Sequence, residues 1–382
     1  MAATGLAAVV TILFMLILRP IASSIGLIDK PGGRKTHHGE VPVIGGLAMF
    51  FGAIFGLSTL HAAPDFLVPF LMASGLLVLT GAVDDRFDLS PYVRLLVQAC
   101  AALLMVYAAR MEIRSFGEIF GPYSFELASG AVLFTLLGTA AAINAFNMMD
   151  GMDGLAGGLA IVGLGTLALG ATLAGQPEQA MPVVVLVAVI GGFLLFNLPL
   201  QFNRPVRAFM GDAGSTFLGF SIAWFGVQFS QGEGAPLKPI MILWASSVPL
   251  MELFSSSIRR LAAGRSPLSA DADHFHHSLV RAGFSVRATF LTLIGLEILL
   301  STVGFALTFG GVSEHVSFML FVTLTVTASI ALVRPERLLP LLPRTLWRER
   351  RGAHRAPQPV VQGVAQPDTV PDATRDPVTA SR

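Results

Sequence analysis

Charged residues and cysteines are scarce in this sequence. Asp, Glu, Lys and Arg make up 13% of its 382 residues, whereas soluble domains carry about 25%. Hydrophobic residues account for 53%, and the mean hydropathy is +0.70. Because so few charges cannot cover a water-facing surface, the lipid bilayer is the expected solvent. The single cysteine, Cys100, excludes an intrachain disulfide and a cysteine-based metal cage.

Apolar segments long enough to cross a membrane recur along the chain. A spanning helix needs about 20 mostly apolar residues, because the hydrocarbon core is about 30 Å thick. We therefore expect an all-α, polytopic membrane bundle of about eleven transmembrane helices. The first apolar segment is interpreted as a retained span, because it lacks the basic leader and cleavage site of a signal peptide. The candidate spans lie near residues 3–19, 44–61, 66–83, 93–110, 130–147, 155–174, 181–198, 214–231, 239–257, 288–309 and 315–333.

Basic residues are distributed unequally between the two sides of these spans. Of the 25 Lys and Arg residues, all but Arg110, Arg114 and Lys238 fall on the side that also holds the C-terminal tail. Cytoplasmic loops are enriched in Lys and Arg. The sequence therefore predicts an N-terminus outside and a C-terminus in the cytoplasm.

The composition changes near residue 335. Residues 1–334 are predicted to form the transmembrane domain, and residues 335–382 a basic, Pro- and Ala-rich cytoplasmic tail without apolar periodicity. Such a composition favours disorder. The basic part of the tail, residues 344–355, is compatible both with contact to anionic lipid and with a solvated segment.

Five loops on the predicted cytoplasmic side hold most of the remaining polar residues, whereas the loops of the other face carry scattered carboxylates. Ionisable groups at a membrane edge are costly unless water, a partner or a ligand compensates them. Five such loops on one face therefore indicate a functional site. The loops span residues 29–42, 84–88, 144–158, 202–215 and 265–277.

Carboxylates beside glycines and basic side chains are typical of sites that bind Mg²⁺ together with phosphate. Mg²⁺ prefers oxygen ligands and usually takes one or two carboxylates plus substrate phosphates. Arg and Lys pair with phosphate charge, and glycine allows backbone N–H groups to approach a phosphate. The residues alone therefore predict phosphoryl chemistry at the cytoplasmic membrane surface.

Two other functions compete with this interpretation. Residues 84–88 read DDRFD, which fits the DDxxD pattern of prenyl-chain enzymes and makes an intramembrane prenyltransferase an alternative. A transporter would bind its substrate near the midplane, often between inverted repeats. The span interiors hold Glu252 and Glu297 as their ionisable residues, and the two halves show no pairing. Both observations favour a surface site over a transport path.

Three histidines, His274, His276 and His277, follow Asp271 and Asp273. Imidazole suits zinc, but the spacing lacks the i, i+4 pair of the zinc helix signature. Contact with phosphate is the favoured interpretation, and a purely structural loop is the alternative.

Taken together, the five loops resemble the polyprenyl-phosphate N-acetylhexosamine-1-phosphate transferase family. The match runs in order from Asp29 to about Phe284, in register with the predicted topology. Residues 266–269 (SPLS) and 281–284 (RAGF) are similar to the branch that uses undecaprenyl phosphate and GlcNAc-1-phosphate. Two departures are small, because Glu252 stands where an aspartate is expected and Arg94 takes the place of a lysine.

The resemblance implies a phosphoglycosyl transferase that moves GlcNAc-1-phosphate from UDP-GlcNAc to undecaprenyl phosphate. The products would be GlcNAc-diphosphoundecaprenol and UMP, the cofactor Mg²⁺ or Mn²⁺, and the pathway a cell-envelope glycan such as O-antigen. Another UDP-N-acetylhexosamine donor is the alternative. The resemblance further implies a bacterial inner-membrane enzyme with its active site on the cytoplasmic face. It is compatible with a homodimer and implies no nucleic-acid partner.

The family's catalytic and metal-binding roles fall on the acidic and amide residues. Asp84, Asp85, Asp150 and Asp212 are the implied catalytic residues, with Asp84 and Asp85 where the lipid phosphate is activated. Asp212 is the implied metal ligand, with Asn147 beside it.

The remaining implied roles concern substrate binding. Phe209 should stack on uracil, and Asp153 should bond the edge of that base. Asn203, with Asp150, completes the polar floor. The residues expected to hold phosphates are Lys35, Arg94, His274, His276 and His277.

Overall fold

The computed structural model describes residues 2–29, 39–60, 65–198, 208–262, 264–266 and 274–333. Within them, every element longer than three residues is an α-helix, so the predicted all-α membrane class is confirmed at this coarse level. The described residues include six helices that are long and apolar enough to cross a membrane. Those segments are Ala2–Ile21, Leu67–Phe87, Ala128–Met149, Leu155–Leu173, Pro177–Asn197 and Val286–Phe309.

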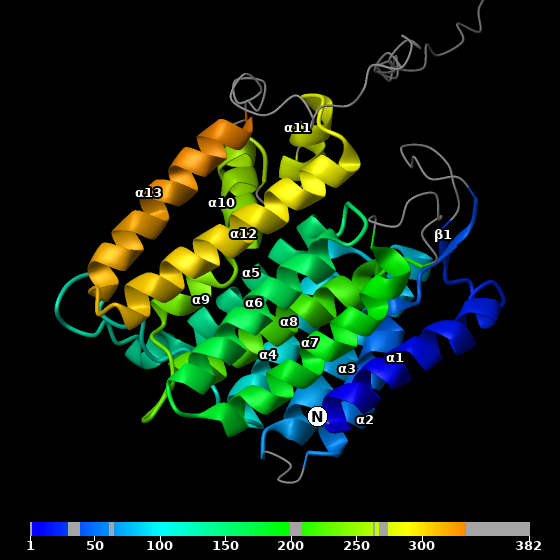
Figure 1. Cartoon of the computed structure of the whole chain (residues 1–382), viewed down its shortest axis with the longest axis horizontal. Coiled ribbons are helices and arrows are strands. Elements are labelled where there is room, and N and C mark those ends of the chain that lie inside the picture. Colours follow the sequence, from blue (N-terminus) through cyan, green and yellow to red (C-terminus); the bar gives the residue numbers. More distant parts are fainter. Residues whose placement is uncertain are drawn as a thin grey trace, which may run out of the picture. The chain divides into compact units, whose positions relative to one another are not determined.

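Helices follow one another along the chain (Figure 1). Each predicted apolar segment contains a helix, and the short helix α11 was not predicted. The elements are α1 (Ala2–Ile21), β1 (Ile28–Asp29), β2 (Val41–Pro42), α2 (Gly45–Ser58), α3 (Leu67–Phe87), α4 (Pro91–Tyr107), η1 (Ala128–Gly130), α5 (Ala131–Met149), α6 (Leu155–Leu173), α7 (Pro177–Asn197), α8 (Gly211–Ser230), α9 (Ile240–Trp244), α10 (Ser247–Ala262), α11 (Phe275–Arg281), α12 (Val286–Phe309) and α13 (Glu314–Val333).

The segment 239–257, predicted as one continuous span, is two helices, α9 and α10. Pro249 lacks a backbone N–H and therefore cannot continue a helical hydrogen-bond ladder. The N–H groups of Ser247 and Val248 bond instead to the carboxylate of Glu297 on α12, at 3.2 and 2.7 Å. Three consecutive positions thus donate no backbone N–H to α9, and the helix is interrupted there.

Helix α8 lies at the centre of the helices that carry the polar loops, in contact with α2, α3, α5 and α6. Glycines allow its first turn to pack closely against two of them, because a Cβ atom on Gly46 of α2 or Gly81 of α3 would collide with the backbone of Ala213. Farther along α8, Phe220 stacks on Phe70 of α3 with ring centroids 6.1 Å apart. Aromatic packing along the helices and glycine contacts at their ends therefore fix α8 against α3.

Apolar side chains are exposed on α3, α4 and α5. Leu79 of α3, Leu96 of α4 and Leu133 of α5 are 63%, 65% and 58% exposed. Exposed apolar surface of this extent is costly in water and is favourable in hydrocarbon. The pattern agrees with a chain whose outer helices face lipid.

Six consecutive helices, α3 to α8, bring their polar loops to the same end of the helical bundle. Helices α3, α5 and α7 end there, and α4, α6 and α8 begin there, because each connection simply reverses the chain direction. The strand pair β1–β2 is antiparallel and precedes α2 at the same end. In Figure 1 this end, with β1 and α11, lies toward the upper right of the helices.

Candidate active site

The first turn of α8 places Asp212 among the ends of three other helices. Gly211 has a left-handed φ of 73°, a conformation that glycine adopts at little cost. A Cβ atom at this position would also collide with the carboxylate of Asp85 and with Val43. The Asp85 carboxylate accepts hydrogen bonds from the backbone N–H groups of Asp212 at 2.8 Å and Ala213 at 3.4 Å. Asp85 therefore caps α8, since a helix leaves its first N–H groups without intrahelical partners.

Asp84 is the neighbouring carboxylate on α3, and its two oxygens have different partners. One accepts the backbone N–H of Leu89 at 2.6 Å, and the other lies 3.2 Å from Nη1 of Arg94. The Asp84 side chain is 2% exposed, whereas that of Arg94 is 37% exposed. The same Nη1 lies 3.7 Å from Asp212. Asp84 thus holds a partly exposed guanidinium beside the Asp212 carboxylate.

Asn147, at the end of α5, contacts the other side of Asp212. Its amide nitrogen donates to Oδ1 of Asp212 and lies 3.0 Å from Oγ of Ser215. Ser215 is fully buried, one turn into α8, while the side chain of Asp212 is 31% exposed. Asp212 is therefore the carboxylate of this group that combines access to a ligand with amide and hydroxyl neighbours.

The carboxylates of the aspartates described above lie close enough to repel one another. Burial, a hydrogen bond shared with Asp84 and the charge of that carboxylate raise the pKa of Asp212 to about 6, although Asn147 and Arg94 oppose the shift. Burial, followed by the charges of Asp212, Asp85 and Asp153, raises the pKa of Asp150 well above its ordinary value. The group carries more negative charge than Arg94 neutralises, so a bound cation would stabilise its ionised form.

The donor set around Asp212 fits a magnesium ion. Carboxylate, amide and hydroxyl oxygens are the hard ligands that Mg²⁺ takes, and rotation of the Asn147 amide would present its oxygen. Across the described part of the chain, no three His, Cys, Asp or Glu side chains are grouped so as to hold a metal by themselves. A cation at Asp212 would thus be completed by water or by a phosphate ligand, as is usual for Mg²⁺.

Phe209 is held by backbone pairing with the first polar loop. Its N–H donates to Pro42 O at 2.8 Å, its carbonyl accepts from Gly45 N at 3.0 Å, and it forms a parallel bridge with Val43. Asn197, at the end of α7, accepts the N–H of Gly154 at 2.7 Å and donates to Ala208 O at 2.9 Å. These contacts join the loops before α2, α6 and α8 next to the aspartates.

The histidine segment lies against the loop that carries Asp150. A Cβ atom on Gly151 would collide with Nε2 of His276, so the imidazole packs directly on the Gly151 backbone. His276 is 1% exposed, and burial, then the neighbouring His277 and His274, lower its pKa to about 3. The imidazole of His276 is therefore neutral at physiological pH. The ring centroids of His276 and His277 are 4.2 Å apart.

Comparison of the sequence with known proteins shows which family the chain belongs to. The model of glycosyl transferase family 4 matches residues 67–230, a range that contains all four catalytic aspartates expected from the sequence. The chain is 38% identical over 344 residues to the undecaprenyl-phosphate alpha-N-acetylglucosaminyl 1-phosphate transferase of Yersinia pestis, covering 89% of this chain and 93% of the relative. The chain belongs to glycosyl transferase family 4.

Two further relatives of this family 4 protein bear the same printed name. The enzyme of Salmonella typhimurium is 37% identical, with 91% of this chain and 95% of the relative covered. That of Escherichia coli strain K12 is 34% identical, with the same coverage. The resemblance inferred from the loops is thereby confirmed, and this family 4 protein is a phosphoglycosyl transferase.

The structure brings together most of the site residues expected from the sequence. Asp84, Asp85, Asp212, Asn147 and Arg94 form one connected group. Asp150 lies near enough for the charges of Asp212 and Asp85 to raise its pKa. Phe209 and His276 lie on segments that contact the neighbouring loops. Asp153 follows Asp150 by three residues and is partly buried. Lys35 and Asn203 lie outside the described residues, as does the tail 335–382. The roles assigned to individual residues stay predictions.

Sequence reasoning missed three residues that position this group. Ser215 ends the predicted loop 202–215 and has no predicted role, although it contacts Asn147. Asn197 stands in an apolar helix, where a lone amide was the available signal. Glu252 departs from the family pattern, yet it accepts the N–H of Phe275 at 2.8 Å and lies 3.0 Å from Nδ1 of His274.

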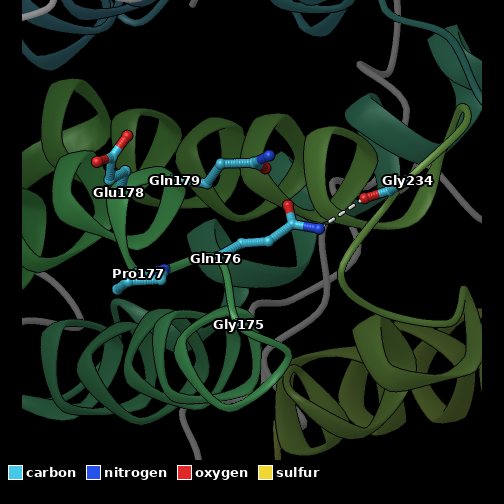
Figure 2. A pocket seen from close by; sticks show the side chains of 6 residues that line it. All are labelled: Gly175, Gln176, Pro177, Glu178, Gln179 and Gly234. Atoms are coloured by element: carbon cyan, nitrogen blue, oxygen red, sulfur yellow. Dashed lines mark hydrogen bonds between the residues drawn. The ribbon is translucent and has the colours of Figure 1, made fainter.

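Two hollows lie apart from the aspartates. A pocket of about 500 Å³ is lined by Gly175, Gln176, Pro177, Glu178, Gln179 and Gly234, with Gln176 donating to Gly234 O at 2.8 Å (Figure 2). It lies beyond the far ends of α6 and α8, about 30 Å from their first turns at 1.5 Å per residue.

The second hollow, an apolar cavity of about 420 Å³, lies between α5, α8, α9, α10 and the loop before α5. Its lining along α5 runs from Gly138 to Phe146, which is the residue before Asn147. The cavity therefore extends along the interior of the helices toward the aspartate end.

Proposed function

We propose that this protein transfers GlcNAc-1-phosphate from UDP-GlcNAc to undecaprenyl phosphate, giving GlcNAc-diphosphoundecaprenol and UMP. The relatives compared above are named for transfer of N-acetylglucosaminyl 1-phosphate with undecaprenyl phosphate, and their matches cover nearly the whole chain. The single observation that supports it most strongly in the structure is the exposed Asp212 carboxylate between Asn147 and Arg94. Oxygen ligands and a guanidinium therefore lie side by side, as binding of a diphosphate together with its cation requires.

Asp212 and Asn147 would hold Mg²⁺ or Mn²⁺ against the diphosphate of the nucleotide sugar. The bound ion would supply Lewis-acid stabilisation of the charge that develops as UMP departs. Arg94 would contact the same phosphates, and Asp84 keeps its guanidinium in place. His276, being neutral and packed on Gly151, would offer hydrogen bonds rather than charge to a phosphate oxygen.

The acceptor attacks the β-phosphorus through an oxygen of the lipid phosphate. A phosphate monoester has a second pKa of about 6, so this oxygen is already largely ionised at neutral pH and needs no strong base. The Asp85 oxygens accept the N–H groups of α8, and those of Asp84 face Leu89 and Arg94. We therefore assign both aspartates to positioning, and expect positioning and electrostatics to supply most of the rate.

The uracil would lie on Phe209, with Asp153 at its edge, and the polyprenyl chain would enter the apolar cavity beside α5. Both placements agree with where the residues lie, because Phe209 precedes the first turn of α8 and the cavity lining ends next to Asn147.

We propose about eleven spans in a bacterial inner membrane, with the aspartates on the cytoplasmic face, where the Lys and Arg excess places them. A supply of cytoplasmic UDP-sugar would then reach the site directly. The lipid product is of the kind that starts a cell-envelope glycan such as O-antigen, and a homodimer would leave each site complete within one chain.

One assay separates this proposal from its alternatives. Purified protein in detergent receives undecaprenyl phosphate, Mg²⁺ and a panel of UDP-N-acetylhexosamines, and the released nucleotide and the lipid product are identified. We expect UMP and a GlcNAc-containing lipid from UDP-GlcNAc. A lipid formed from another UDP-sugar instead would change the donor. Inorganic pyrophosphate release with a prenyl donor, and no UMP, would favour the prenyltransferase.

A further inference from the structure

Two fully buried glutamates outside the aspartate cluster each bond to the first turn of another helix. Glu297 of α12 accepts the N–H groups of Ser247 and Val248, which open α10, at 3.2 and 2.7 Å. Glu252 of α10 accepts the N–H of Phe275, which opens α11, at 2.8 Å. Both glutamate side chains are 0% exposed.

Glu297 determines where α10 begins and how it is directed. Pro249 has no N–H, and the N–H groups of Ser247 and Val248 make no bond to α9 because Glu297 accepts both. Inside a membrane, where water cannot substitute, an N–H group without an acceptor is costly. The carboxylate is also within 3.5 Å of Oγ of Ser301 on its own helix. The start of α10 is therefore tied to α12 by one side chain.

Glu252 links α10 to the histidines. It follows Val248 by one turn of α10, and its second oxygen lies 3.0 Å from Nδ1 of His274 and 3.4 Å from Arg259. The next histidine, His276, is buried against Gly151, beside Asp150. A displacement of α10 would therefore move the start of α11 and the imidazole that touches the loop carrying Asp150.

We infer that Glu297 is a positioning residue of the transfer reaction, which holds the segment His274–His277 against the Asp150 loop through α10 and Glu252. Glu297 touches no substrate. Its effect on the reaction rests on the proposed function, because it acts on the contact between the histidines and the donor diphosphate.

Glu297→Gln tests the inference with little change of shape. The amide keeps one acceptor, but its NH₂ group opposes the second N–H of α10. Loss of one buried hydrogen-bond partner corresponds to roughly a 5- to 10-fold effect, and we expect it as a higher KM for UDP-GlcNAc. The KM for undecaprenyl phosphate should change as well, because Pro249, Leu250 and Phe254 of α10 line the apolar cavity in which the polyprenyl chain would lie. The control is Glu314→Gln on α13, a buried glutamate 3.7 Å from Lys238 at the opposite end, which should leave both constants unchanged.

Hydrogen exchange supplies a readout that does not depend on turnover. The amides of residues 275–281 should exchange faster in Glu297→Gln than in the wild type or in Glu314→Gln. In a His276→Ala background, Glu297→Gln should add little to the KM for UDP-GlcNAc, because two residues that act through one element are not additive.

An ordinary structural role for Glu297 predicts other results. Lower yield and melting temperature with unchanged KM and unchanged exchange at 275–281 would overturn the inference. If Glu297→Gln does not accumulate, Glu297→Asp keeps the charge with a shorter reach and is judged by the same two readouts. A wild type that does not use UDP-GlcNAc would overturn the proposed function, while the exchange result would still decide the role of Glu297.

Discussion

The carboxylate of Asp85 accepts the backbone N–H of Asp212 at 2.8 Å. This bond joins the end of α3 to the first turn of α8 and separates the tasks of the two aspartates. Asp85 caps a helix, whereas the side chain of Asp212 remains 31% exposed next to Asn147 and Arg94. Substitutions of Asp85 should therefore act on the helix cap, and substitutions of Asp212 on cation binding.

Asp212→Asn should abolish transfer without unfolding the protein. The amide keeps the shape of the side chain but loses the charge that a cation needs, so we expect a loss of at least about 1000-fold in kcat/KM, comparable with losing a main electrostatic contact. Excess Mg²⁺ should not restore it. The matched control is Asp88→Asn, an exposed aspartate of the DDRFD run, which should retain near-normal activity. Equal losses in both variants would contradict the metal assignment.

Asp85→Ala and Asp85→Asn separate a helix cap from a general base. An asparagine side chain still accepts an N–H, and loss of a cap costs about 1 kcal/mol. We expect Asp85→Ala to lower the melting temperature and the activity more than Asp85→Asn does. A general base predicts equal loss of activity in both variants, with the melting temperature unaffected. Steady-state kinetics and thermal unfolding of the two proteins decide between these outcomes.

Arg94 should control the pH dependence of the site. Its charge lowers the pKa of Asp212 against the raising effects of burial and Asp84. Arg94→Gln should therefore move the acidic limb of the activity profile to higher pH and raise the KM for UDP-GlcNAc. Arg94→Lys keeps the charge and should retain the position of that limb. An acidic limb that does not move in Arg94→Gln would argue against contact between Arg94 and Asp212 in solution.

Binding of Mg²⁺ should weaken as the pH falls through about 6. The pKa of Asp212 is raised from 3.8 to about 6 in the fold, so protons compete with the cation below that value. In metal-free protein the folded state holds its proton longer than the unfolded chain, so stability falls as the pH rises from 3.8 to 6. Mg²⁺ should therefore raise the melting temperature more at pH 7.5 than at pH 5.5. An equal increase at both pH values would place the ion elsewhere.

A bulky side chain in the apolar cavity should affect the lipid substrate alone. Ala142 of α5 lines the cavity, so Ala142→Phe should raise the KM for undecaprenyl phosphate by about tenfold, which corresponds to about 1.4 kcal/mol. The KM for UDP-GlcNAc should be unchanged. The control is Gly165→Phe on α6, where a Cβ atom would meet no neighbouring atom. An effect on the nucleotide sugar instead would move the lipid path away from this cavity.

The helices and the grouping of the aspartates were predictable because both follow from local sequence. Apolar length sets each span, and the alternation of chain direction brings Asp84, Asn147 and Asp212 to one end. The interruption between α9 and α10 was not predictable in this way. It depends on Glu297, which lies about 50 residues farther along the chain and replaces the lost helical acceptors.

The separate roles of individual residues could not be predicted from the sequence either. Asp84 and Asp85 are adjacent residues with different partners. Asp84 faces Arg94, whereas Asp85 faces the N–H groups of α8. Asn197 lies outside the predicted loops and Ser215 ends one of them, and their importance comes from the loop and the amide that fold against them. Contacts between distant segments of this kind are set by packing, not by spacing.

The most direct test of the account uses UDP-GlcNAc labelled with ³H in the sugar and ³²P in the β-phosphate, incubated with the purified protein, undecaprenyl phosphate and Mg²⁺. Transfer of a sugar phosphate predicts that both labels enter the lipid in equal molar amounts, with one unlabelled UMP released for each lipid formed. Entry of ³H alone, with ³²P retained in UDP, would show transfer of the sugar without its phosphate and would contradict the account.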